Sequence, residues 1–164
     1  MSKDTSASHD TLWKLIKDTK FGMLTHRSES GALHAHPLTT QNRDIDEDSR
    51  LYFFIPRDGE ICQRLKTDPK TCLAYANPSD DSYVSVSGTA SFVEDMEKKR
   101  ALWSAAAKAW FPDGVEDPNL ALLAVHIDHA EYWDVTESKL TQLFKMATAA
   151  VTGNPPNMGE HKKL

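Results

Sequence analysis

The chain has 164 residues, of which 40% are hydrophobic and 26% charged, and its 24 acidic and 19 basic side chains give a formal net charge of -5. This length suits one compact domain, and a charged fraction near the globular average of about 25% excludes a disordered or low-complexity protein. The negative charge offers no general attraction for nucleic acid or anionic membrane, so neither is an expected partner. Apolar runs such as Leu120–Val125 are too short to span a bilayer, and the sequence predicts a cytoplasmic protein.

Two cysteines, Cys62 and Cys72, are ten positions apart. They form neither a CxxC motif nor part of a zinc-ligand spacing. Because unpaired cysteine packs like a small hydrophobic residue, we expect two reduced structural thiols in a reducing compartment. A redox pair is the alternative.

The first half of the chain predicts a helix, three strands and a short second helix. Apolar residues recur at helical spacing over 9–19, after a polar start. The strands are predicted at 21–26, 32–39 and 51–55. Pro56 ends the third strand, and the short helix that follows stops at Asp68-Pro69. The acidic run 44–48 is predicted to be a solvated turn, because Ser49 stands where a calcium loop needs glycine.

The second half predicts three further strands and two helices. The strands are predicted at 71–76, 83–93 and 120–135. Gly88 in the fifth strand indicates a bulge or a close backbone approach. Helices are predicted over 94–109 and 138–151, before a polar tail. Six strands joined mostly by short turns predict a small antiparallel β-barrel of the α+β class and disfavour a doubly wound parallel sheet.

The motifs that are missing exclude several chemistries. The sequence contains no GxGxxG, GxxxxGK[ST], HExxH or GxSxG. Classical nucleotide-binding folds and serine hydrolases are therefore disfavoured.

His34 and His36 are the first candidates for a binding site. They lie two residues apart on a predicted strand, so both imidazoles point to one face. Such a pair can contact a phosphate or flavin, bind a metal, or lie at a surface or interface. The sequence places no third ligand, so no metal site is predicted. A second group around His126, Asp128 and His129 is predicted to be a polar strand end.

Several segments, in a fixed order, resemble one known family. The segments are Phe21–Thr25, Ala35–Thr39, Leu51–Ile55, Leu65–Pro69, Tyr83–Ala90, Leu102-Trp103, Phe111–Gly114 and Ala130–Asp134. Together they cover about residues 10–135 and are similar to the flavin-binding split β-barrels. The closest branch resembles the general stress proteins related to pyridoxamine 5'-phosphate oxidase.

The resemblance implies a homodimer of six-stranded antiparallel split β-barrels with flanking helices. It implies FMN, or alternatively FAD, at the subunit interface of a flavin-binding domain over 9–151. The polar composition of the first residues and the glycine and prolines at 153–156 predict flexible ends at 1–8 and 152–164. The residues that it places at the flavin are His34, His36, Pro37, Leu38, Thr39, Phe53, Phe54, Ile55, Arg57, Glu60 and Arg64, with Trp103 and Trp133 near the dimer interface.

Two positions differ from the residues usual in that family. His36 stands where the family usually has arginine, and Asp58-Gly59-Glu60 stands where it usually has Ser-x-Lys. Both differences remove positive charge from a phosphate site, and Arg57, Arg64 or His34 would have to substitute for it.

The function that the resemblance implies is that of a stress-related FMN-binding protein, which we expect to be an oxidoreductase of unknown substrate because a flavin itself carries the redox chemistry. The alternatives are a non-catalytic flavin-binding or sensing protein and a ligand-free structural dimer. Metal-dependent hydrolysis at His34 and His36 is the least favoured. Oxidation of vitamin B6 is not expected, because residues 158–164 lack the arginine-rich segment that such oxidases use for substrate phosphate.

Overall fold

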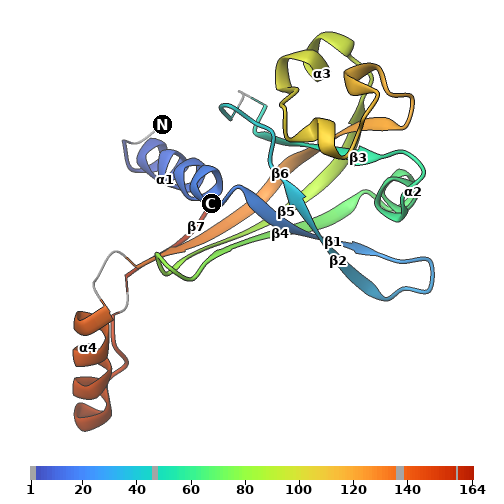
Figure 1. Ribbon diagram of the computed structural model, residues 1–164. Coiled ribbons are helices and arrows are strands. Elements are labelled where there is room, and N and C mark those ends of the chain that lie inside the picture. Colours follow the sequence, from blue (N-terminus) through green and yellow to red (C-terminus); the bar gives the residue numbers. More distant parts are fainter. Residues whose placement is uncertain (1–2, 46–47, 136–138, 158) are drawn as a thin grey trace.

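The structure is a computed structural model that describes residues 3–45, 48–135, 139–157 and 159–164 (Figure 1). Its helices are α1 (Lys3–Thr19), α2 (Glu60–Thr67), α3 (Met96–Leu102) and α4 (Lys139–Thr152). Its strands are β1 (Phe21–Arg27), β2 (Leu33–Thr39), β3 (Arg50–Pro56), β4 (Lys70–Asn77), β5 (Ser82–Val93), β6 (Leu120–Asp134) and β7 (Glu160–Lys163).

The strands form one antiparallel sheet that curls into a half-open barrel (Figure 1). The order along the sheet is β2-β1-β4-β5-β6-β3, and the two outer strands, β2 and β3, approach each other. The first half of β6 pairs with β3, while its last residues, Glu131–Asp134, pair with β7. The predicted antiparallel split barrel of the α+β class is confirmed.

The core lies on the concave side of the sheet. Side chains of adjacent strands form a row across it: Leu24 pairs with Leu73, Leu73 with Val86, and Val86 with Ala130. All four are at most 1% exposed. Because side chains alternate between the two faces of a strand, this register fixes which residues of every neighbouring strand point inward.

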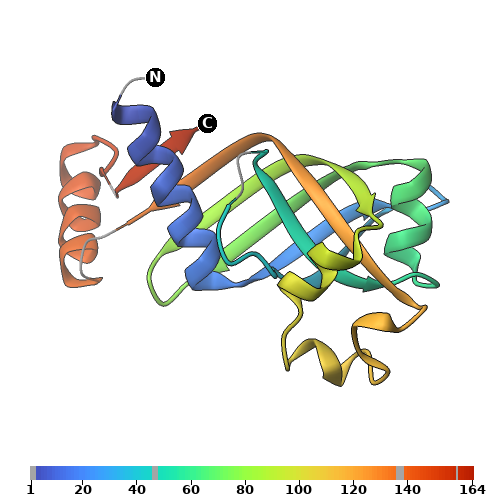
Figure 2. The same cartoon turned by 90° about the horizontal axis from the view of Figure 1, so that it is seen from above.

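Helices α1 and α2 lie at opposite ends of the barrel (Figure 2). The buried face of α1 carries Leu12, Leu15 and Ile16, at the spacing of one helical stripe. The buried face of α2 carries Cys62 and Leu65. Each helix therefore closes the core at one end, and α2 does so beside β1 and β3.

A smaller apolar cluster lies on the outer face of β3 and β6. Tyr52, Leu122 and Ala124 of the sheet pack there with Leu102 of α3. The sequence predicts one helix over 94–109, but α3 ends at Leu102, and two short 3-10 turns, Ala107–Ala109 and Gly114–Glu116, follow. Alanine favours helix, yet burial of Ala107 and Phe111 decides the path here.

The bulge predicted at Gly88 is present. The pairing of β5 with β6 shifts by one residue between Ser87 and Gly88, which leaves Asp128 as the extra residue of β6. A Cβ atom on Gly88 would lie 2.4 Å from Cγ1 of Val125 and 2.7 Å from the carbonyl oxygen of His126. Glycine is therefore required because β6 passes so close, and not because of an unusual backbone angle.

Helix α4 stands away from the barrel (Figure 1). Its large apolar side chains are exposed, and they are Leu140, Leu143, Phe144, Met146 and Val151. A hydrogen bond from Nε2 of Gln142 to Oδ2 of Asp81, at 2.9 Å, links it to the tip of the β4–β5 hairpin. Nζ of Lys145 also donates a hydrogen bond to the carbonyl oxygen of Asn157, but the apolar side chains of α4 remain exposed in the single chain.

The two ends of the chain are more regular than predicted. Helix α1 already begins at Lys3, within the segment 1–8 that the sequence predicts to be flexible. Glu160–Lys163 of the predicted polar tail forms β7, because the second half of β6 has an open edge there and Leu164 packs against the core. Residues 1–2, the centre of the acidic run at 46–47, position 138 of the predicted last helix and position 158 lie outside the described residues.

Both cysteines are free, with Cys62 buried and Cys72 partly buried. Over the part of the chain that the structure describes, no helix combines the length and the apolar composition needed to cross a bilayer.

Candidate functional site

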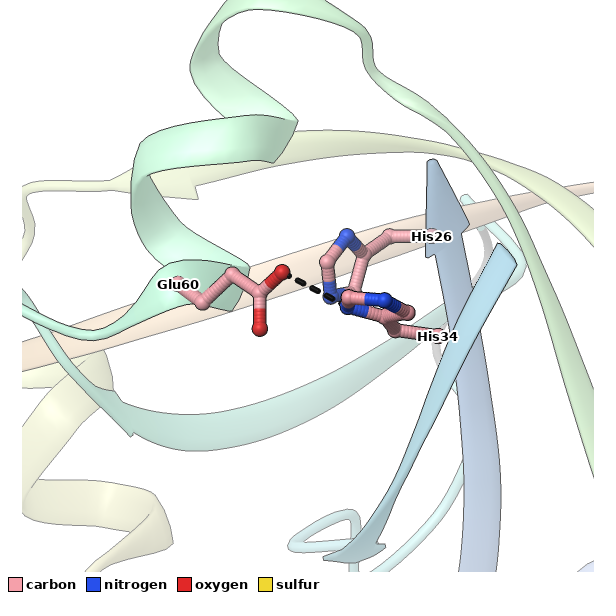
Figure 3. Close-up of side chains that lie close together, drawn as sticks. All are labelled: His26, His34 and Glu60. Carbon is pink, nitrogen blue, oxygen red and sulfur yellow. Dashed lines mark hydrogen bonds and ion pairs between the residues drawn. The ribbon is translucent and has the colours of Figure 1, made fainter. Parts of the chain in front are cut away.

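Four polar side chains from three elements meet at the end of the barrel that α2 covers. The β1–β2 register places His26 directly opposite His34, and Leu24 opposite His36. Residues opposite each other in a pair share a face, so all three imidazoles belong to the inward face that Leu24 defines. Glu60, the first residue of α2, points toward His26 and His34 (Figure 3). We call His26, His34, His36 and Glu60 the His–Glu cluster.

The donor atoms of the His–Glu cluster are close together. Nδ1 of His34 lies 2.8 Å from Oε1 of Glu60, and Nε2 of His36 lies 3.8 Å from Oε2 of the same carboxylate. Nε2 of His26 is 3.0 Å from Nε2 of His36, a distance at which two imidazoles share one N–H. His26, His34 and Glu60 each have one donor atom within 4.8 Å of the others.

The members of the cluster differ in burial. His26 is 1% exposed, in a position that the strand pattern gives to core residues, and its Nδ1 has no hydrogen-bond partner among the described residues. The side chains of His34 and Glu60 are about half exposed, at 46% and 42%. The cluster therefore has a rigid inner member and an outer side that small molecules and ions can reach.

The electrostatics of the cluster favour an ionised carboxylate and a neutral imidazole. The hydrogen bond from His34 holds the pKa of Glu60 below its usual range. Burial, followed by the proximity of His26, lowers the pKa of His36. At neutral pH this part of the site is consequently negative or neutral, and not a cationic pocket.

The nearest arginines lie beside the cluster and already have partners. Nε of Arg64 donates to the carbonyl oxygen of Arg27, while Nε of Arg27 lies 3.6 Å from Oδ2 of Asp68. Arg57 donates two hydrogen bonds to Glu94, at 2.9 and 3.0 Å. The structure thus brings Arg64 to the same strand end as the cluster, whereas Arg57 is turned toward the segment before α3.

The strand residues predicted for a flavin site divide into two groups. Pro37, Leu38 and Thr39 continue β2 beyond His36, and among the described residues β2 pairs only with β1. On β3, Phe53 and Ile55 are fully buried in the core, so neither residue is accessible to a ligand in the single chain. The side chain of Phe54 points to the outer face.

The two predicted tryptophans lie in different places. Trp103 makes an edge contact with Phe54, with ring centroids 5.6 Å apart. Trp133 lies at the far end of β6 and stacks on His161 at 4.7 Å. Neither contacts the His–Glu cluster.

Sequence reasoning missed His26. It lies in an apolar run, and its two-residue phase with Gly22 and Leu24 is the signal that could have placed it on the inner face. The predicted group around His126 and His129 does not converge, because Nδ1 of His126 contacts Asp128 while Nε2 of His129 contacts Glu131. That group lies in the middle of β6, on both sides of the bulge at Asp128, and not at the end of the strand.

Comparison with known proteins agrees with the split-barrel class. A family model described as pyridoxamine 5'-phosphate oxidase like matches residues 7–157. The chain is 27% identical to protein bli-3 of Neurospora crassa over 165 residues, covering 93% of this chain and 77% of that protein. The chain belongs to the pyridoxamine 5'-phosphate oxidase-like family.

Solved structures show the same fold. The structure of general stress protein 26 from Jannaschia superposes with a TM-score of 0.75 at 22% identity and covers 98% of both chains. The general stress FMN/FAD binding protein of Xanthomonas citri superposes with a TM-score of 0.68 at 31% identity, covering 82% of this chain and 92% of that one.

Proposed function

We propose that this protein binds a flavin, FMN or FAD, as a homodimer in the cytoplasm, and that it is a flavin-dependent oxidoreductase. The observation that carries the proposal is family membership over residues 7–157, together with 31% identity to a protein named for FMN/FAD binding. When bound, the flavin would supply the redox chemistry, and the protein would supply binding, orientation and exclusion of water.

The residues of the candidate site suit one part of a flavin better than another. The single-sided pairing of β2, over Pro37–Thr39, leaves backbone groups that suit the polar edge of an isoalloxazine ring. The phosphate end does not fit equally well, because the ionised Glu60 occupies it and the pKa of His36 is lowered. We therefore expect FMN and riboflavin to bind with similar affinity, since a phosphate gains little from this cluster.

Exposed apolar surface supports the dimer. Phe21 and Met23 of β1, Leu33 of β2 and Tyr83 of β5 are exposed on the sheet, in addition to the apolar side chains of α4. Surface of this extent is typical of an interface. We expect light scattering at micromolar concentration to give twice the chain mass. A paired substitution on α4, L143D with F144D, should weaken the dimer, whereas a monomeric wild-type protein would contradict this part of the proposal.

The flavin is tested on freshly purified, untagged protein. We expect either a flavin absorption spectrum as isolated, or quenching of tryptophan fluorescence when FMN or riboflavin is titrated into the colourless protein. Saturable binding of one flavin per chain supports the proposal. No spectral change and no quenching with any flavin would overturn it.

A non-catalytic binding protein is the second candidate, and Glu60 is the observation that favours it. Anaerobic addition of NADH or NADPH to the flavin-loaded dimer separates the two candidates. Bleaching of the flavin absorbance at a rate above that of free flavin supports an oxidoreductase. A bound flavin that neither donor reduces, and that reoxidises no faster than free flavin after chemical reduction, supports binding alone.

A further inference from the structure

The His–Glu cluster has the composition of a metal site. It offers three imidazole nitrogens and one carboxylate, a donor set that suits Zn²⁺, Co²⁺, Ni²⁺ or Cu²⁺. Calcium and magnesium select oxygen ligands, and the cluster provides them from a single side chain. The carboxylate that disfavours a phosphate here favours a cation.

We propose that His26, His34, His36 and Glu60 bind one divalent transition-metal ion of the zinc class. Three of these residues, His26, His34 and Glu60, are the one group of such donor atoms with suitable spacing among the described residues. His36 adjoins them, with its Nε2 3.0 Å from Nε2 of His26 and 3.8 Å from Oε2 of Glu60. The sequence alone left the pair His34 and His36 without a third ligand. The fold supplies two more, because the hairpin register brings in His26 and the start of α2 brings in Glu60.

The distances are compatible with such an ion. Ligand atoms at 2.0–2.2 Å from a tetrahedral ion are roughly 3.3–3.6 Å from one another. The contacts from His26 to His36 (3.0 Å), from His36 to Glu60 (3.8 Å) and from His34 to Glu60 (2.8 Å) lie on both sides of that value. The side chains of His34, His36 and Glu60 are 46%, 33% and 42% exposed, so they have room to rotate and bring their donor atoms to one centre beside the fixed His26.

The arrangement of protons also points to a cation. Nε2 of His26 and Nε2 of His36 face each other, and two like nitrogen atoms at 3.0 Å can hold one proton between them. A metal ion about 2.0 Å from both nitrogens would take the place of that proton, with the ring of His36 turned so that the two lone pairs converge on one point beside the line that joins them. His26 is buried and fixed by the strand, so this ligand is already held in place before the ion binds.

A second histidine group on the same sheet provides the matched control. Glu131 contacts His129 with one oxygen and His161 with the other, each at 3.1 Å. It has the same residue types at similar distances, but it lies on exposed strands and its atoms do not converge on one point among the described residues. We expect this group to bind metal weakly.

The test uses full-length, untagged, chelator-treated protein without flavin. Zn²⁺ is titrated by calorimetry and Co²⁺ by its visible spectrum, in wild type and in the variants H26L, H34A and E60Q, with H129A/H161A as the control. We expect one ion per chain and a tetrahedral Co²⁺ spectrum in wild type. H26L and H34A should lose at least about 100-fold in affinity, E60Q about tenfold or more, and H129A/H161A less than about twofold.

In the variant H26L, leucine suits the buried position, so a loss of Zn²⁺ binding is not expected to come from unfolding. Far-ultraviolet circular dichroism checks that the variant folds. No binding of Zn²⁺ to wild type, or binding that the cluster variants leave unchanged, would overturn the proposal. So would an equal loss in H129A/H161A. The probe is the metal alone, so this result is separate from the flavin titrations.

Discussion

The His–Glu cluster and the group of His129, Glu131 and His161 contain the same residue types but differ in how the fold holds them. In the first, β1, β2 and α2 each contribute, and one imidazole is buried within the barrel. In the second, all members come from β6 and β7, and their side chains are exposed to between 22% and 49%. The comparison shows that composition does not define a site. Three elements meeting at one mouth of the barrel can enclose a point, whereas two neighbouring strands only form a surface.

The largest effect that we predict concerns Gly88, at the bulge that separates the two ends of β6. In G88A the new Cβ atom would overlap Val125 and the backbone of His126. We expect the free energy of unfolding to fall by about 1–3 kcal/mol, measured by urea denaturation. S87A, at the exposed neighbouring residue, is the control and should change it by less than about 0.5 kcal/mol. Equal stability of wild type and G88A would show that β6 can shift freely at this point.

The second prediction exchanges the charge at each glutamate. In chelator-treated protein, E60K should raise the affinity for FMN about tenfold or more, because an ammonium would replace a carboxylate at the proposed phosphate end of the flavin site. Riboflavin, which lacks the phosphate, should change by less than about threefold. E131K should leave both affinities unchanged. Fluorescence titrations with the two flavins measure this, and a similar gain for riboflavin would mean that Glu60 does not face the phosphate.

The third prediction concerns the exposed group alone. His161 stacks on Trp133 and contacts Glu131, so H161A should reduce the free energy of unfolding by about 0.5–1 kcal/mol. The change should be visible in the tryptophan emission spectrum and absent from the Zn²⁺ titration. A loss of Zn²⁺ affinity in H161A would erase the distinction between the two groups.

The smallest effect is expected at the exposed ion pair between Arg57 and Glu94. The hydrogen bonds from Arg57 lower the pKa of Glu94. A carboxylate whose pKa is lower in the folded state stabilises the fold above its unfolded pKa, and this contribution is lost as the pH falls through the folded value. E94Q should therefore cost up to about 0.5 kcal/mol at pH 7 and less than that below about pH 4. Urea denaturation at the two pH values measures it, and a constant difference would assign the effect to packing.

The sequence predicts the barrel well because its strands carry strong two-residue alternation. It predicts the bulge at Gly88 for the same reason, since a glycine interrupts that alternation. It cannot place β7, because Glu160–Lys163 has no apolar alternation of its own. This segment forms a strand because it pairs with the open edge of β6. The length of α3 is also a tertiary effect, set by the burial of Phe111.

For the candidate site, the sequence identifies His34, His36 and Glu60 as individual residues, but it does not predict that their side chains contact one another. That contact depends on the register of the β1–β2 hairpin and on the packing of α2 against β1, and both are long-range properties. His26 was missed because a histidine in an apolar run looks like a tolerated core residue. Its importance becomes clear only when the pairing puts it opposite His34.

The pairing of β7 with β6 has a mechanical consequence for α4. Glu160 pairs with Asp134, so the two ends of the segment that carries α4 leave the sheet side by side. Leu164 adds hydrogen bonds in both directions with Ala130, at 2.6 and 3.2 Å. The segment that carries helix α4 is thus attached to the sheet at both of its ends. Contact between its apolar side chains and a second copy therefore costs less conformational entropy than the ordering of a free chain end would.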